Sequence, residues 1–340
     1  ILYTGNSGSQ TITQTGNSGF TPDMTIVKSR SFGNGANIYD IARGFGKGLA
    51  TFDNGAEDNE GNMGSPSINS GKGTLSFSGG GATGDLNTSP RTYIALTWLA
   101  GGSASTNTVG SIDSEVSANT LAGFSLGTYT GDGNAATIGH GIGIIPRMVW
   151  IRNRASANWA VYSAIAGNTH YQRLDTEVAR ADDDSFFNDT TPTTTVFSIG
   201  ADSTATSKNG ANYVFYAWAD VPGYQKIGAY IGNGNANGPV INTGFKPAWI
   251  MIKSTTQAST NWEFFDDNIE PNNVVGDQNF LNIANAEADN DHKMDWLGNG
   301  FKLRDTSSSV NTNNQTYVYL AIAKHPFGGD GSLSAIGPAR

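Results

Sequence analysis

One short sequence pattern occurs three times in the chain, at residues 20–28, 144–152 and 245–253. In each copy a proline is followed by an apolar run, and a lysine or arginine lies six residues after that proline. Proline suits the first position of a strand, where the sheet needs no N–H from it. Because the apolar residues do not alternate with polar ones, the run predicts a strand buried on both faces. The prolines are Pro22, Pro146 and Pro247.

Other landmarks recur in the same order around each copy, which predicts three homologous units. A tyrosine precedes each proline, and a second tyrosine begins an apolar run downstream of it; these are Tyr3, Tyr129 and Tyr230, and Tyr93, Tyr213 and Tyr317. We expect the units at residues 1–100, 124–222 and 223–327, and we expect the first to be truncated at its start. The composition predicts a linker at 101–123, flexible at least at its start, and a loosely tethered C-terminal tail at 328–340.

Turn residues between many short apolar runs predict an all-β fold of three tandem antiparallel repeats, each a β-sandwich or jelly roll. Glycine contributes 44 residues, and charged residues make up only 14% of the chain. A net charge of −9 disfavours binding to nucleic acid and to anionic membranes. No apolar run is long enough for membrane insertion. Cysteine is absent, which excludes disulfides, thiolate metal sites and a cysteine nucleophile.

Two sets of residues are candidates for binding. The cations that end the proline strands are Lys28, Arg152 and Lys253. We expect their stems to cover the edge of the core while the charges reach water; the alternative is three equivalent anchors for an anionic sugar or partner. Trp159 and Trp262 occupy equivalent positions after an asparagine, either in the core or as platforms for a sugar. The first unit has Ile38 at that position.

The sequence offers no constellation for catalysis. The four histidines lack zinc-helix spacing, and His140 lies in a Gly-His-Gly segment that predicts a turn. The acidic clusters at 53–60, 182–184 and 289–291 are expected in solvated loops, with calcium binding as the alternative, although none matches the EF-hand spacing. We therefore expect no catalytic residue, no metal, no cofactor and no enzymatic activity. Paired carboxylates for glycoside hydrolysis stay open as an alternative, because acids are plentiful.

These landmarks resemble a family of tandem β domains found in virion structural proteins and tail fibres of bacteriophages, especially marine ones. The matching stretches cover nearly the whole chain and include residues 19–30, 122–131, 146–154, 299–304 and 321–327. The resemblance implies a viral protein, a component of the phage virion. It carries no agreed biochemical activity, so it adds no catalytic residue.

Together, the residues and the resemblance predict a non-enzymatic virion structural protein on the particle surface, outside the cell. We expect a tail fibre or receptor-binding appendage that serves host recognition. Its expected partners are other virion proteins and a host surface glycan, and it is expected to form a homo-oligomer, with a trimer favoured. The alternatives are a capsid decoration or cement protein, a polysaccharide-degrading tail spike, and an extracellular carbohydrate-binding module.

Overall fold

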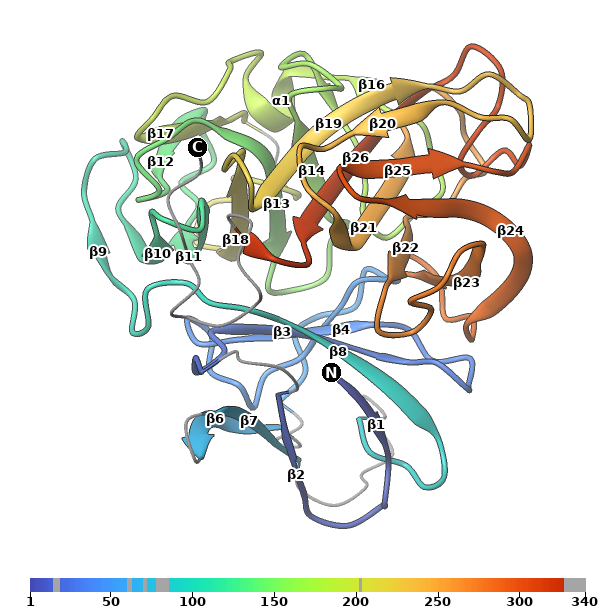
Figure 1. Ribbon diagram of the computed structural model, residues 1–340. Coiled ribbons are helices and arrows are strands. Elements are labelled where there is room, and N and C mark those ends of the chain that lie inside the picture. The colour runs from blue at the N-terminus through green and yellow to red at the C-terminus, as the bar shows by residue number, and fades with distance from the viewer. Residues whose placement is uncertain (15–18, 60–62, 70–71, 78–85, 202–203, 327–340) are drawn as a thin grey trace.

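The computed structural model describes residues 1–14, 19–59, 63–69, 72–77, 86–201 and 204–326 (Figure 1). The fold is all-β, as predicted, with 46% of residues in strands and 2% in helices. The predicted tail at 328–340 lies outside the described residues. No helix in the described part of the chain is long and apolar enough to cross a membrane.

The strands fall into three groups along the chain. The first repeat contains β1 (Leu2–Thr4), β2 (Gln10–Thr13), β3 (Met24–Ser29), β4 (Asn37–Asp40), β5 (Leu49–Ala50), β6 (Met63–Asn69), β7 (Lys72–Phe77) and β8 (Thr92–Trp98). The second contains β11 (Phe124–Thr130), β12 (Ala136–Gly139), β13 (Pro146–Asn153), β14 (Ala160–Ser163), β15 (His170–Tyr171), β16 (Ala181–Asp182), α1 (Asp184–Phe187), β17 (Val196–Ile199) and β18 (Asn212–Ala219). The third contains β19 (Gln225–Ile231), β20 (Val240–Asn242), β21 (Pro247–Ser254), β22 (Glu263–Asp266), β23 (Val275–Phe280), β24 (Ala288–Leu297), β25 (Gly300–Leu303) and β26 (Thr316–Ala323).

The same strand order recurs in the three repeats. It is β1-β8-β3-β4 in the first, β11-β18-β13-β14 in the second and β19-β26-β21-β22 in the third, and all the pairs are antiparallel. Pro146 and Pro247 open β13 and β21, and Pro22 lies two residues before β3. Each proline strand therefore lies inside its sheet, between a tyrosine strand and the strand that follows it.

The landmark tyrosines are buried core residues in every repeat. Tyr3 stacks on Tyr93, Tyr129 on Tyr213 and Tyr230 on Tyr317, with ring centroids 5.0, 4.9 and 5.0 Å apart. The first hydroxyl of each pair donates to a backbone carbonyl of its own repeat, at Leu86, Thr206 or Val310. A buried tyrosine needs such a partner for its hydroxyl, so each bond ties the first strand of its repeat to the segment just before the second tyrosine strand.

The proline strands are buried on both faces, as the sequence predicts, and the structure shows what covers each face. In β13, Val149 and Ile151 pack in the core of their own repeat, whereas Met148 and Trp150 pack in a cluster that all three repeats build. We call this cluster the shared core. Its members include Met24, Ile26, Leu96 and Trp98 from the first repeat, Met148, Trp150, Trp159, Tyr216 and Trp218 from the second, and Trp249, Met251, Trp262, Phe264 and Leu320 from the third.

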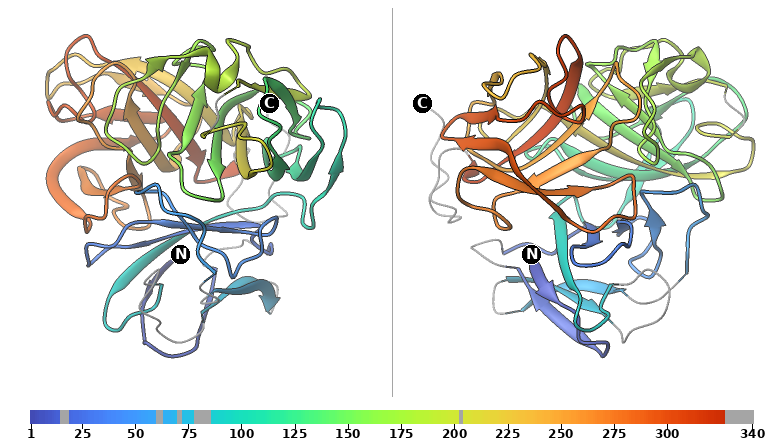
Figure 2. Two further views of the ribbon diagram at one scale, coloured as in Figure 1. Left: turned by 180° about the vertical axis from the view of Figure 1, so that it is seen from behind. Right: turned by 90° about the vertical axis from the view of Figure 1, so that its right-hand side faces the viewer.

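The three repeats are arranged around this shared core. The first repeat lies below the other two, the second is on the left and the third on the right in Figure 1, and the views in Figure 2 agree. Trp98 of the first repeat meets Trp249 of the third edge-to-face, with centroids 5.8 Å apart, and packs near Phe124 of the second at 6.5 Å. Each main sheet thus turns one face toward its own sandwich and the other toward its two neighbours.

The predicted linker at 101–123 is not a free connection, because two strands lie within it. This segment contains β9 (Ser105–Asn107) and β10 (Ser114–Asn119), and β10 pairs with β11 over six residues. Val116 is buried in the core of the second repeat. An uncovered edge strand exposes a row of unpaired backbone groups, and pairing along β11 outweighs the flexibility that the Gly/Ser/Thr composition indicates.

Loss of packing in the shared core should destabilise all three repeats together. Met251 is fully buried there, and Met251→Ala should lower the free energy of unfolding by about 2–5 kcal/mol. Urea unfolding followed by tryptophan fluorescence and by circular dichroism should give one coincident transition. Amide hydrogen exchange should accelerate in the first and second repeats as well as in the third.

The exposed Leu121 supplies the control, because its side chain is 83% exposed. Leu121→Ala should change the free energy of unfolding by no more than about 0.5 kcal/mol. Two separate unfolding transitions in Met251→Ala, with faster exchange confined to the third repeat, would contradict a core that the repeats share.

Candidate functional site

The repeats meet at three seams that close a ring around the shared core. At each seam the end of one repeat's proline strand contacts a segment of a neighbour: β13 meets residues 50–57, β21 meets residues 172–180, and β3 meets residues 281–287. We call them seam 2-1, seam 3-2 and seam 1-3, and the first number is the repeat that supplies the proline strand. In each repeat the proline strand lies in one seam, and the segment C-terminal to it (residues 50–57, 172–180 or 281–287) lies in another.

The predicted cations lie in these seams and not in solvent. Lys28, Arg152 and Lys253 are 1%, 0% and 0% exposed. The expectation that their charges reach water is therefore wrong. Each cation follows two shared-core residues on the same face of its strand, such as Met148 and Trp150 in β13, and the neighbouring repeat covers that face. The sequence predicts the face but carries no local sign of the neighbour.

The buried charges bond mainly to carbonyl oxygens. In seam 1-3, Lys28 Nζ donates to the carbonyls of Asn34 and Asn285, each at 2.5 Å. In seam 2-1, Arg152 Nη2 donates to Gly55 O at 2.5 Å, and Nη1 lies 3.7 Å from Asp175 Oδ2. Two of these acceptors, Asn285 and Gly55, belong to the adjacent repeat, so these two cations bond across their seams.

Lys253 in seam 3-2 donates to both the carbonyl and the hydroxyl oxygen of Thr260, at 2.5 and 2.9 Å. Burial lowers the pKa of Lys28 and of Lys253 to about 8. Burial also lowers the pKa of Arg152 to about 10, although Asp175 and Asp53 oppose the shift. All three sites disfavour a charge, and all three are placed where the repeats touch.

Trp159 and Trp262 are fully buried in the shared core. Their indole N–H groups cross the seams: Trp159 Nε1 donates to Ala50 O and Trp262 Nε1 to Arg173 O, both at 2.8 Å. Ile38 takes the equivalent place in the first repeat, and Thr51 Oγ1 instead bonds Leu281 O at 2.5 Å in seam 1-3. The structure thus brings the two predicted sets together, but as seam contacts with no surface for a sugar.

Ion pairs close two of the seams on the outside. Arg154 holds Glu57 through two hydrogen bonds of 2.8 and 2.9 Å, and Arg30 holds Glu287 through two of 2.7 Å. Seam 3-2 has Thr255 in the place of the arginine, so this position has no side-chain ion pair. Its backbone still bonds across the seam, because Arg180 N donates to Thr255 O at 2.9 Å. These arginines are not among the predicted binding residues, although a second cation follows the first by two residues in two of the three copies.

Arg43 joins the first two repeats inside seam 2-1. Its side chain is fully buried, with Nε 2.7 Å from Asp40 and Nη1 3.1 Å from Glu57, and Tyr216 of the second repeat donates its hydroxyl to Asp40 at 2.6 Å. Burial alone would lower the pKa of Arg43, but Asp40, Tyr216 and Glu57 outweigh it and raise that pKa. Residues 42–44 are among the stretches that carry the resemblance to phage proteins, but the sequence predicted no role for Arg43.

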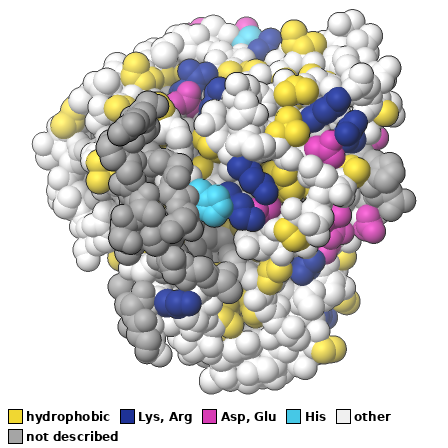
Figure 3. Space-filling view, in the orientation of Figure 1, with side chains coloured by type: hydrophobic (Ala, Val, Ile, Leu, Met, Phe, Trp, Pro, Cys, Tyr) yellow, Lys and Arg dark blue, Asp and Glu magenta, His cyan; other side chains and the backbone are white. Residues whose placement is uncertain are grey.

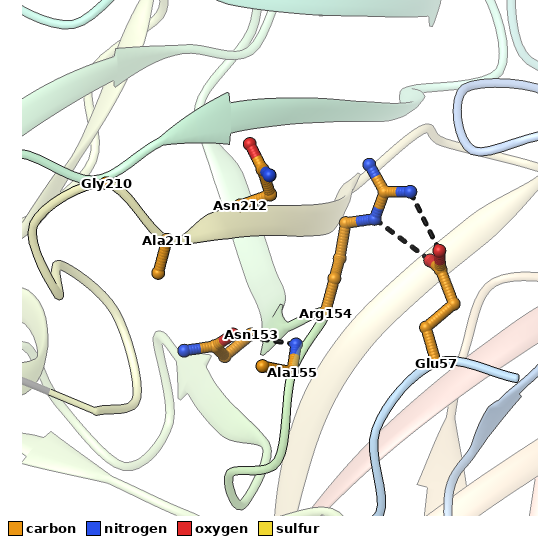
Figure 4. A pocket seen from close by; sticks show the side chains of 7 residues that line it. All are labelled: Glu57, Asn153, Arg154, Ala155, Gly210, Ala211 and Asn212. Atoms are coloured by element: carbon orange, nitrogen blue, oxygen red, sulfur yellow. Dashed lines mark hydrogen bonds and ion pairs between the residues drawn. The ribbon is translucent and has the colours of Figure 1, made fainter.

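A depression of about 400 Å³ opens above seam 2-1 (Figure 4). It is lined by Glu57, Asn153, Arg154, Ala155, Gly210, Ala211 and Asn212. Burial raises the pKa of Glu57, but the hydrogen bond from Arg154 and the charge of Arg43 outweigh it and hold that pKa below its usual value. An ionised carboxylate held between two arginines does not suit a proton donor for glycoside cleavage. The depression can offer hydrogen bonds to a small polar group.

The remaining candidates have structural roles. His140 is buried in the loop that follows β12, with Nε2 3.2 Å from Thr193 O, and its Nδ1 accepts from Ile142 N. Burial lowers its pKa. Asp183 of the second acidic cluster caps α1. Among the residues that the structure describes, no group of three or more acidic or histidine side chains is placed to hold a metal ion.

Titration of the buried lysines should appear in the stability of the chain. The pKa of Lys28 and Lys253 in the folded state is about 8, below the ordinary 10.5, so between these values the unfolded chain binds more protons. The free energy of unfolding should therefore rise as pH increases from 8 to 10, by about 2 kcal/mol per lysine. Urea unfolding at both pH values measures the rise.

Lys28→Met should remove its share of that rise, because methionine does not titrate. The control is Lys208→Met, which replaces a lysine on the exposed surface, outside the seams. An equal slope in wild type and Lys28→Met would show that burial does not lower the pKa of Lys28.

Arg43→Met should be far more damaging than Arg154→Met. Loss of Arg43 leaves Asp40 buried without its cation, which should cost about 3–5 kcal/mol. The Arg154 side chain is 23% exposed, and its loss should cost about 1 kcal/mol or less. Denaturant unfolding of both variants makes the comparison, and similar losses would contradict the bridging role of Arg43.

Residues 1–326 match the model of a protein family described as a domain of unknown function, DUF7483. No curated protein and no solved structure gives a significant match.

Proposed function

The chain belongs to the DUF7483 family of domains of unknown function, and we propose that it is a non-enzymatic structural component of a bacteriophage particle, exposed on the particle surface. The phage setting comes from the resemblance of its repeated landmarks to virion structural and tail-fibre proteins. A role in assembly or adhesion comes from the architecture.

The observation that carries the proposal is the shared core. Three sandwiches that bury one sheet face each against the others form a block in which no repeat can unfold alone without exposing its neighbours. The seams add buried cations and the cross-repeat Arg43 group. A block of this kind suits a virion component that must stay folded outside the cell, where an unfolded copy is not replaced by new synthesis.

The arrangement of the three repeats within one chain resembles the symmetry of the expected trimer. Three repeats of one chain take positions around one core, as three copies do in a cyclic trimer. We propose that one chain occupies the place that three identical chains fill in other fibres. Association with other virion proteins then needs surfaces outside the seams.

The surface fits a protein that contacts other proteins or polar sugars. Figure 3 shows a face on which uncharged groups predominate and apolar side chains lie in separate spots. The tryptophans and cations predicted to bind a glycan are buried, so they do not support a carbohydrate-binding module. Host recognition would therefore use other residues.

Particles of the phage that encodes the chain provide the test. Antibodies against the purified chain should label intact particles in electron microscopy, and reconstruction should place its density on the outside. Labelling at the tail with blocked adsorption supports an appendage, and labelling of the shell supports a decoration protein. Absence of the chain from purified particles would overturn the proposal.

A further inference from the structure

The edge strand β11 of the second repeat is covered by the chain itself. β10 runs antiparallel along β11, with Glu115 opposite Thr128, and Val116 enters the core. Just before β10, Ile112 N donates to Thr137 O of β12 at 3.2 Å, and Ser111 exchanges two hydrogen bonds with Thr137 at 2.8 and 2.9 Å. This segment therefore closes the gap between the two sheets of the sandwich.

The equivalent gap in the third repeat has no such cover among the described residues. β19 and β20 are the two end strands of the eight-stranded sheet. They lie side by side (Figure 1), since Lys226 Nζ of β19 donates to Asn242 O of β20 at 3.0 Å. Only residues 220–224 lie between β18 and β19, too few to supply a strand that covers β19.

The repeat alignment gives the positions that match the covered edge. Tyr230 corresponds to Tyr129, so Ala229 and Ile231 take the places of Thr128 and Thr130. Ile227 directs its N–H and its carbonyl away from β26, to Asp220 and Arg147. Because alternate residues of an antiparallel strand share this orientation, the backbone groups of Ala229 and Ile231 also face the open side.

Apolar side chains flank these backbone groups. Ile231 is 62% exposed, and Val240, which takes the place of Thr137 at the start of β20, is 63% exposed. At one end of the gap, Lys226 donates to Asn242 O. In the second repeat the equivalent carbonyl, Gly139 O, accepts instead from the hydroxyl of Ser114 in the covering segment. The opposite end keeps an open backbone edge between two exposed β-branched residues, which is the chemistry that pairs with an added strand.

We propose that the edge formed by β19 and β20 binds an extended strand of a partner polypeptide. The strand runs antiparallel to β19, pairs with the backbone of Ala229 and Ile231, and covers Ile231 and Val240 with small or β-branched side chains. The segment at 111–119, which covers the equivalent edge in the second repeat, shows how such a strand would bind. The inference stands on the internal comparison of repeats and does not depend on the phage setting.

A labelled synthetic peptide with the sequence of residues 105–119 is the probe. Titrated into the full chain, it should bind saturably, with Kd below about 1 mM. Ile231→Lys should weaken binding by about tenfold or more, since a charge on an edge strand opposes added strands. Ala229→Pro should weaken it similarly, because it removes an outward N–H and leaves the pairing with β26 intact.

Leu121→Lys is the matched control, because Leu121 is exposed in the second repeat; it should keep the affinity within about twofold. Melting temperatures verify that each variant folds, and Val240→Lys replaces any variant that does not. Failure of the peptide to bind, or equal binding by wild type, Ile231→Lys and Ala229→Pro, would overturn the proposal. NMR resonance shifts confined to β11 during the peptide titration would also overturn the proposal, because they would mean that the peptide displaces β10. Self-association that Ile231→Lys abolishes would assign the edge to a second copy.

Discussion

Burial of both faces of the proline strands is the constraint on which the rest of the structure depends. A sandwich needs only one apolar face on each sheet, yet β13 places Val149 in its own core and Trp150 in the shared core. The second apolar face forces each repeat to pack against others. Three such faces close around one centre, and that closure explains why the repeats form a ring and not a string.

The same geometry explains the buried charges. A strand that keeps one face in the shared core for its whole length carries its last residue of that face into the seam, and Lys28 and Arg152 are those residues. Carbonyls of the adjacent repeat, Asn285 and Gly55, receive them. The charges thus favour one arrangement of repeats, because any other leaves a buried cation without acceptors.

The three repeats differ more at the edges of their main sheets than in their hydrophobic cores. The core landmarks, such as the stacked pair Tyr129 and Tyr213, recur with nearly constant geometry. The edge of the main sheet differs: β10 covers β11, whereas β19 ends its sheet. Backbone groups at an edge need partners as much as apolar side chains need a core, and the repeats differ in whether the chain itself supplies that partner.

Sequence alone determined the all-β class, the order of the recurrent strands and the burial of both faces of β13, because periodicity and turn residues act locally along the chain. Only the tertiary structure decided what covers each face. Nothing near Lys28 in the sequence indicates that Asn285 lies beside it, and the composition at 101–123 gave no sign that β11 needs a neighbour. Contacts between repeats depend on how whole sheets pack, and that packing is set by the shape of three surfaces at once.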